Sequence, residues 1–330
     1  MSAANDAPRG ANDQDSAQIV VAGSLAFDFI MTFPGLFKDH ILPDKLHVIN
    51  ISFLVDKIER NRGGCAGNVA YSLALLGEDP RVVGTAGNDF ADYGRFLEAQ
   101  GVDTSAIVVL EDETTASAFI TTDQSDSQIQ GFYVGAMGRA SELSLASLAG
   151  DRARACIISP DDPAAIVRHC QEARDSGLTF FFDPSFQVTH MDGPTLRDCA
   201  RGARGLLLND YEYAVFEDKT GYRGDAVFEL VDFVVVTLGA KGSRILQQGE
   251  KAIEIPPATV AEAIDPTGAG DAFRAGFLAG WMQGFEFAVC GRMGSVASAY
   301  AVEKYGTQSH GYTRSEFDQR YADNFGRPPQ

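Results

Sequence analysis

Cysteine and histidine are scarce in this sequence. Its 330 residues include five cysteines and five histidines. The cysteines are odd in number and widely spaced, and no two of them form a C-x-x-C pair. No two histidines form an H-x-x-x-H pair. These absences argue against a disulfide framework and against a structural zinc site.

Positive charge is also scarce. Lysine and arginine number 27 against 45 aspartates and glutamates, so the formal net charge is −18. Such an excess of negative charge repels phosphate backbones and anionic lipid, so we expect neither nucleic acid nor a membrane as a partner. A small anionic ligand stays compatible with it, because that ligand needs only a local positive field. A saline habitat is one explanation of the acidity that a single sequence leaves open.

Long apolar runs are absent as well. No stretch reaches the ~18 apolar residues that span a bilayer, and the first residues lack the apolar core of a signal peptide. We therefore expect a cytoplasmic protein. Residues 1–16 are small and polar, and they offer little that a core could bury. They predict a disordered tail.

Short apolar runs and helix-like stretches alternate through the remaining chain. The runs do not alternate with polar residues, which is typical of strands covered on both faces of a parallel sheet. They lie at residues 19–23, 81–84, 155–159, 178–182, 205–208 and 233–237. Helices are predicted at residues 68–76, 92–100 and 163–176, and each is followed by a glycine. This order predicts an α/β fold with a doubly wound, mostly parallel sheet flanked by helices.

Two segments interrupt the alternation. Residues 29–60 are irregular, with apolar residues spread among polar ones. Residues 115–135 predict a hairpin around the turn-forming sequence Asp123-Gln124-Ser125-Asp126. We expect the two insertions to form a small β-sheet lid that closes over the main domain. The predicted lid comprises residues 29–61 and 113–136, and the predicted large α/β domain comprises residues 17–28, 62–112 and 137–330.

The most informative segment is IDPTGAGDAFRAGF, at residues 264–277. Its small residues at 268–270 let backbone amides approach a ligand, and a helix is predicted to begin at about Asp271. Free amides at the start of a helix form a site for an anion. A carboxylate beside such a site suits the removal of a proton from an attacking hydroxyl, although Asp271 is equally suited to capping the helix. The segment fits neither the Walker A pattern nor G-x-G-x-x-G.

The same segment resembles the C-terminal signature of the ribokinase-like (phosphofructokinase B) carbohydrate and nucleoside kinases. The N-terminal signature of that family is similar to GGCAGNVA at residues 63–70. Two weaker marks lie between them: Asn209-Asp210-Tyr211-Glu212 resembles the family's N-x-x-E pattern, and TLGAKG at 237–242 resembles its nucleotide-binding turn. The resemblance covers about residues 18 to 312, and it implies a ribokinase-like fold whose large domain binds a nucleotide.

The resemblance also implies roles in an ATP-dependent reaction. Asp271 would be the general base, and the backbone amides of Gly268, Ala269 and Gly270 would form an anion hole for the transferring phosphoryl group. The residues implied for the ATP site are Asn209, Glu212, Thr237, Gly239 and Ser295. Glu212 would act on Mg²⁺ through water. The residues implied for a monovalent cation such as K⁺ are Asp265 and Thr267, with carbonyl groups around Ala301, Lys304 and Gly306.

The acceptor of the phosphoryl group is implied by a further set of positions. In similar kinases, the residues that match Asp28, Gly63, Gly64 and Asn68 bind the hydroxyl groups of a sugar ring. The alternatives are a helix-capping role for Asp28 and a helix-starting turn at the two glycines. Phe132, in the predicted lid, would stack on a purine, or it would serve in ordinary lid packing.

Residues 24–28, 52–55 and 63–68 resemble bacterial adenosine or nucleoside kinases more than kinases of free sugars. Arg274 is common in that subgroup, and its place one turn into the helix suits either a phosphate or ATP contact or an exposed surface position.

These observations predict an ATP-dependent kinase that phosphorylates the 5′-hydroxyl of adenosine or a related ribonucleoside. A ribokinase- or fructokinase-type sugar kinase on the same fold is the first alternative. A catalytically silent regulator that binds nucleotides or sugars is the second, because fold and motif do not prove turnover. The sequence leaves the acceptor, the requirement for a monovalent cation, and the choice between monomer and homodimer open.

Overall fold

A nine-stranded sheet forms the body of the computed structural model, which describes residues 17–41, 50–125 and 127–327. The strand order is β13-β12-β11-β10-β9-β8-β1-β4-β5. The strands from β5 to β11 in this order pair in parallel, and β12 and β13 add an antiparallel edge. Their bounds are β1 (Gln18–Ala22), β4 (Pro80–Gly87), β5 (Ile107–Leu110), β8 (Ala153–Ile158), β9 (Thr179–Phe182), β10 (Ala203–Asn209), β11 (Val231–Thr237), β12 (Ser243–Gln247) and β13 (Ile253–Ile255).

The sheet is covered on both faces, because successive residues of β1 enter two different cores. Ile19 and Val21 belong to one buried cluster, and Val20 and Ala22 belong to the other. Helices that pack in the first cluster are α2 (Cys65–Leu75), α3 (Ala91–Ala99), α9 (Ala269–Met282), α10 (Phe287–Val302) and α11 (Arg314–Phe325). Helices on the other face are α4 (Leu145–Leu148), α5 (Pro163–Ser176), α6 (Gln187–His190), α7 (Gly193–Ala200) and α8 (Asp210–Thr220). The predicted doubly wound, mostly parallel sheet is therefore confirmed.

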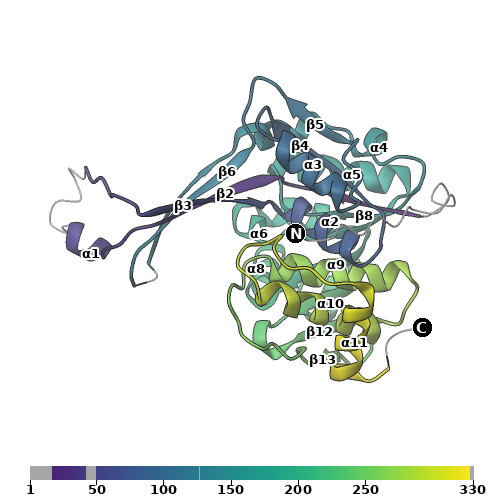
Figure 1. Cartoon of the computed structure of the whole chain (residues 1–330). Coiled ribbons are helices and arrows are strands. Elements are labelled where there is room, and N and C mark those ends of the chain that lie inside the picture. The colour runs from purple at the N-terminus through teal and green to yellow at the C-terminus, as the bar shows by residue number, and fades with distance from the viewer. Residues whose placement is uncertain (1–16, 42–49, 126, 328–330) are drawn as a thin grey trace.

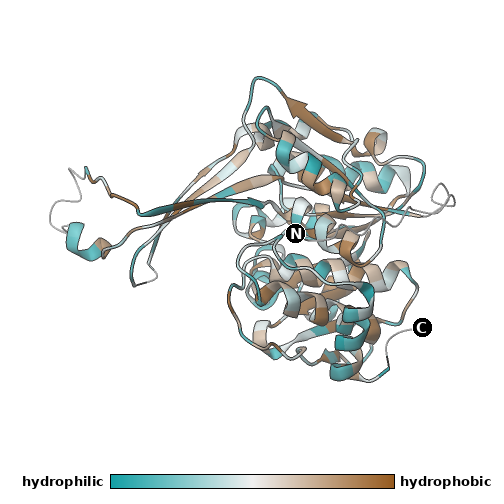
Figure 2. Ribbon diagram, in the orientation of Figure 1, coloured by the Kyte–Doolittle hydropathy of each residue, from teal (hydrophilic) through white to brown (hydrophobic). Residues whose placement is uncertain are grey.

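The flanking helices carry both apolar and polar segments (Figure 2), as expected for helices with one face in the core and one in water. Short 3₁₀ helices lie at η2 (Gly135–Glu142), η3 (Gly224–Glu229) and η4 (Gly239–Lys241). Helix α5 has the predicted bounds, and the Asp162 carboxylate caps its first turn. Within the described ranges, no helix has the length and apolar character that crossing a membrane would require.

A second sheet, with the strand order β3-β2-β6-β7, extends from the body as a long arm (Figure 1). Its strands are β2 (Ala26–Thr32), β3 (Lys57–Gly63), β6 (Ala116–Thr122) and β7 (Gln128–Tyr133), and the short helix α1 (Phe37–His40) lies near the tip. The predicted hairpin is present as β6 and β7, and the Asp123 carboxylate accepts the backbone N–H of Ser125 at 2.8 Å in its turn. Asp126, in the same turn, lies outside the described residues.

The arm corresponds to the predicted lid, but its first strand begins before residue 29. Strand β2 starts at Ala26, and β3 runs to Gly63 beside α2. The arm therefore begins inside residues that the sequence placed in the large domain, so that Asp28 lies on it. The predicted disordered tail, residues 1–16, lies outside the described part of the chain.

Candidate active site

The loop before α9 leaves backbone amides open at the carboxyl edge of the sheet. Gly268 caps the helix in a left-handed conformation, with φ of +78°, and a Cβ there would lie 3.0 Å from the Thr307 side chain. Helix α9 begins at Ala269, two residues before the predicted start. The Ala269 N–H donates to the Pro266 carbonyl at 3.2 Å, whereas the amides of Gly268 and Gly270 have no partner among the described residues. Two of the three predicted anion-hole amides are thus free to bind a ligand.

Asp271 lies in the first turn of α9, directly after these amides. Its Oδ2 accepts a hydrogen bond from Asn68 Nδ2 at 2.8 Å, a contact that joins α9 to α2. Its Oδ1 has no hydrogen-bond partner in the described ranges. Burial raises the pKa of Asp271, and the positive charge of Arg274 opposes that shift. The geometry leaves one carboxylate oxygen available to accept a proton.

The orientation of Asn68 is set by two residues that the sequence did not suggest. Gln308 Nε2 donates to Asn68 Oδ1 at 2.9 Å and also to the Tyr93 hydroxyl. The Tyr93 hydroxyl in turn donates to the Gly63 carbonyl at 2.9 Å. Because its Oδ1 is already bound by Gln308, the Asn68 side chain presents its NH₂ group to Asp271. No motif spacing connects these residues in the sequence.

Gln308→Leu is expected to lower kcat by about tenfold and to destabilise the fold by about 1–3 kcal/mol. The substitution removes the donors for two buried acceptors, and such groups are expensive to leave unpaired. Asn68 is then free to turn its oxygen toward Asp271. Steady-state kinetics and thermal unfolding measure the two effects. Gln319→Leu, at an exposed amide that donates to Asp323 at 2.7 Å, is the matched control. Equal kcat values for the two variants would contradict the positioning role.

Asp28 lies within β2, so the helix-capping interpretation of this residue is wrong. An ideal Cβ at Gly63 would lie 2.6 Å from Asp28 Oδ2, so a side chain at residue 63 would displace the carboxylate. Gly64 does begin α2, as the turn interpretation predicted; its φ is +87°, and a Cβ would lie 2.5 Å from the Ser24 carbonyl. Burial and the nearby charge of Asp265 raise the pKa of Asp28 to about 6.

Phe132 of β7 and Asp28 of β2 lie at the same register position of the arm, on either side of β6. Ala118 of β6 pairs with Asp28 on one side and with Phe132 on the other. Directly paired residues project from the same face of a sheet, so the carboxylate and the ring share one face. Phe132 is 54% exposed. Its ring is therefore open to a ligand, and packing within the lid does not account for it.

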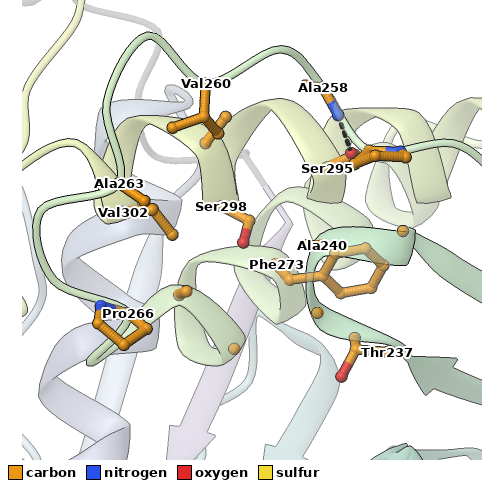
Figure 3. Close-up of a pocket in the computed structure, with 16 residues that line it drawn as sticks. Thr237, Ala240, Ala258, Val260, Ala263, Pro266, Phe273, Ser295, Ser298 and Val302 are labelled. Atoms are coloured by element: carbon orange, nitrogen blue, oxygen red, sulfur yellow. Dashed lines mark hydrogen bonds between the residues drawn. The ribbon is translucent and has the colours of Figure 1, made fainter.

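Two adjoining cavities lie beside the start of α9. The first, of about 380 Å³, is mostly apolar and lies between the start of α9, α10 and the loop that carries Pro257, Val260 and Pro266 (Figure 3). The second, of about 470 Å³, is lined by Asp271, Asn209, Glu212 and Arg274. The cavities share the lining residues Thr237, Gly239 and Gly270. An apolar cavity thus adjoins a polar cavity whose lining includes the candidate base.

Ser295 lines the apolar cavity, but its hydroxyl forms hydrogen bonds with the loop that carries Pro256 and Ala258. It accepts the Ala258 N–H at 2.7 Å, as Figure 3 shows, and it donates to the Pro256 carbonyl at 3.2 Å. Ser295 therefore shapes the cavity wall by holding that loop.

Asn209 and Glu212 form a capping box at the start of α8. Asn209 Oδ1 accepts the Glu212 N–H at 2.8 Å, and Glu212 Oε2 accepts the Asn209 N–H at 2.8 Å. In the described ranges, no three His, Cys, Asp or Glu side chains gather as metal ligands. Because Glu212 also lines the polar cavity, its carboxylate could hold a magnesium ion through water and phosphate oxygens, as Mg²⁺ is commonly bound.

The residues implied for a monovalent cation are joined by Asp265. Its carboxylate accepts the Thr267 N–H at 2.9 Å and the Gly306 N–H at 3.0 Å. The Lys304 N–H donates to the Ala301 carbonyl at 3.1 Å, in the turn that follows α10. The structure therefore brings the two predicted loops together next to Gly268.

Arg274 is buried, so the alternative of a surface arginine is wrong. Its side chain is 7% exposed, and its Nε lies 2.6 Å from Asp183 Oδ2. Asp183 follows β9 at the carboxyl edge of the sheet. No motif spacing in the sequence connects Asp183 with Arg274.

Comparisons with known proteins support a kinase. The model of the pfkB family carbohydrate kinases matches residues 17–313. The nucleoside kinase of Methanothermobacter thermautotrophicus is 31% identical over 319 residues, which cover 96% of this chain and 99% of that protein. The structure of Burkholderia thailandensis nucleoside kinase in complex with inosine has a TM-score of 0.84 and 37% identity, covering 94% of this chain and 99% of that one. Its complex with ADP-inosine has a TM-score of 0.82 and 39% identity, covering 94% and 97%.

Proposed function

Because the chain belongs to the pfkB family of carbohydrate kinases, we propose that it phosphorylates the 5′-hydroxyl of adenosine or a related ribonucleoside with ATP. The family makes it an ATP-dependent phosphotransferase. The likeness to nucleoside kinases, one of them in complex with inosine, supports a nucleoside as the acceptor.

One observation carries the proposal: Asp271 lies between the start of α2, at Gly63 and Gly64, and the polar cavity that it helps to line. On one side, Asn68 connects it to the turn at Gly63 and Gly64. On the other side lies the polar cavity, which adjoins the apolar one. A base between a pocket for a hydroxyl-bearing acceptor and a pocket for a nucleotide is the arrangement that direct phosphoryl transfer requires.

The acceptor would bind beneath the arm. The Asp28 carboxylate would accept hydrogen bonds from two vicinal ribose hydroxyls, and Gly63 leaves the room that this contact needs. Phe132, on the same face, would stack on the base. A kinase of free ribose or fructose would retain the contact at Asp28 but would have no use for the exposed ring.

The nucleotide would extend through both cavities. Its adenine suits the apolar cavity near Val260 and Phe273, and its phosphates suit the polar one. Mg²⁺, when bound near Glu212 through water, supplies charge neutralisation to the phosphates. A monovalent cation at the loops around Asp265 would stabilise the positions of the neighbouring amides. Asp271 Oδ1 would take the proton of the attacking hydroxyl while the amides of Gly268 and Gly270 bind the transferring group.

ADP release with ATP, Mg²⁺ and K⁺ tests the proposal against a panel of adenosine, inosine, guanosine, cytidine, ribose and fructose. Turnover on nucleosides but not on free sugars is the expected result. Turnover only on ribose or fructose would overturn the nucleoside assignment and leave the sugar kinase. Tight nucleotide binding without turnover on any acceptor would favour the silent regulator.

A further inference from the structure

We propose that Arg274 is a second catalytic residue, whose guanidinium contacts the transferring phosphoryl group from the side of Gly270. This inference rests on the proposed kinase function, but not on which acceptor the kinase uses.

The position of Arg274 directs its side chain toward the anion site. It follows Asp271 by three residues on α9, so the two side chains lie on one face of the helix. An ideal Cβ at Gly270 would lie 2.7 Å from Arg274 Nη1. The guanidinium therefore lies against the open side of Gly270, whose amide has no partner among the described residues. Arg274 and Gly270 both line the polar cavity.

A buried carboxylate fixes the orientation of the guanidinium. Asp183 Oδ2 lies 2.6 Å from Arg274 Nε, and the side chains are 1% and 7% exposed. Glu212 Oε2 lies 3.9 Å from Nη2. The contact is an ion pair without hydrogen-bond geometry. Since a guanidinium is rigid and planar, a carboxylate beside Nε restricts where Nη1 can point. Asp183 thus holds Nη1 toward Gly270, and Asp183 itself is a positioning residue.

The charge balance of the cavity supports a role in the reaction. The lining holds three carboxylates, Asp210, Glu212 and Asp271, and Asp183 adjoins it. Arg274 is the only Lys or Arg in the described lining of the polar cavity. The negative charges of Asp183, Asp271 and Glu212 raise the pKa of Arg274, which keeps the side chain charged despite its burial. Phosphoryl transfer is limited by how well positive groups stabilise the charge on the equatorial oxygens. A cation already fixed beside these amides supplies that stabilisation without reorganisation.

In the proposed step, the acceptor hydroxyl oxygen forms a bond to the γ-phosphorus while its proton passes to Asp271 Oδ1. The bond between the γ-phosphorus and the oxygen that bridges it to the β-phosphorus breaks, and ADP leaves with that electron pair. Arg274 Nη1 donates to an equatorial oxygen of the transferring group throughout. Arg274 neither gains nor loses a proton.

The test must separate lost chemistry from lost folding, because Arg274→Met alone leaves Asp183 buried without its partner. The informative variant is therefore Arg274→Met with Asp183→Asn, which removes both charges. Arg95→Met with Asp92→Asn, at an exposed ion pair on α3, is the matched control. Circular dichroism and thermal unfolding establish that each double variant is folded before its kinetics are compared with those of the parent, on the acceptor that the parent uses.

We expect the Arg274→Met, Asp183→Asn variant to lose about 10³-fold in kcat, in the range known for arginines that contact a transferring phosphoryl group, while its KM for ATP changes little. Guanidinium ion, added below denaturing concentration, should restore part of kcat in Arg274→Ala with Asp183→Asn. A folded variant with kcat within threefold of the parent, or the absence of rescue, would overturn the proposal. A parent without any kinase activity would instead reveal the failure of the proposed function.

Discussion

Asp271→Asn is expected to lower kcat by about 10²–10⁴-fold without weakening nucleotide binding. Removal of a general base costs a factor of this size. Asparagine keeps the shape of the side chain and can still accept the hydrogen bond that Asn68 donates at 2.8 Å. It cannot take up the proton of an attacking hydroxyl. ADP release measures kcat, and calorimetric titration with ATP and Mg²⁺ measures nucleotide affinity.

A suitable control is Asp175→Asn on α5. The exposed Asp175 carboxylate also accepts a side-chain amide at 2.8 Å, from Gln171, but it lies on the opposite face of the sheet from α9. That substitution should leave kcat unchanged. An Asp271→Asn variant that kept more than a tenth of the parent kcat would contradict the assignment of Asp271 as the base.

The same substitution has an expected effect on stability. Burial raises the pKa of Asp271 in the folded protein above its unfolded value. A group shifted in this direction stabilises the fold at pH below its unfolded pKa, and that contribution is lost as the pH rises through its folded pKa. At a pH above its folded pKa, the ionised, partly buried carboxylate therefore opposes folding. Asp271→Asn should unfold at a higher temperature than the parent, a gain that separates its loss of activity from damage to the fold.

Six of the nine strands of the main sheet were predictable because both of their faces are buried, whereas β5, β12 and β13 match none of the predicted apolar runs. Burial on both sides selects continuous apolar runs, and all five residues of β1 are buried. Strand β3 could not be predicted in this way. Its sequence is KIERNRG, and mostly exposed or half-buried residues alternate irregularly along it. Its pairing with β2, rather than burial, makes it a strand.

The candidate site likewise contains residues that the sequence could predict and residues that it could not. Gly268, Gly270 and Asp271 were predictable because they stand within one short motif. The Gln308 contact to Asn68 joins residues that are 240 positions apart, and Arg274 meets Asp183 only because α9 packs beside the end of β9. Neither contact leaves a spacing pattern in a single sequence. The residues that position the motif groups therefore became visible only once the chain was folded.

Asp28→Asn is expected to raise the KM for the acceptor by about 10²-fold while kcat changes much less. The carboxylate would accept two hydroxyl hydrogens, and each charge-assisted hydrogen bond contributes about 1.5–3 kcal/mol. Because Asp28 would bind the ribose equally before and during the reaction, its loss weakens binding more than it slows the chemical step. Asp56→Asn, at an exposed carboxylate in the same arm, serves as the control.

The pH dependence of the KM for the acceptor tests the role of Asp28 more specifically than the size of KM alone. Burial and the charge of Asp265 raise the pKa of Asp28 to about 6. Below that pH the carboxyl is protonated and loses one of the acceptors that the hydroxyls need, so the KM of the parent should rise as the pH falls through about 6. The Asp28→Asn variant has no proton to gain there, so its KM should show no such rise. If the two KM profiles ran parallel, Asp28 would not be the group that binds the ribose hydroxyls.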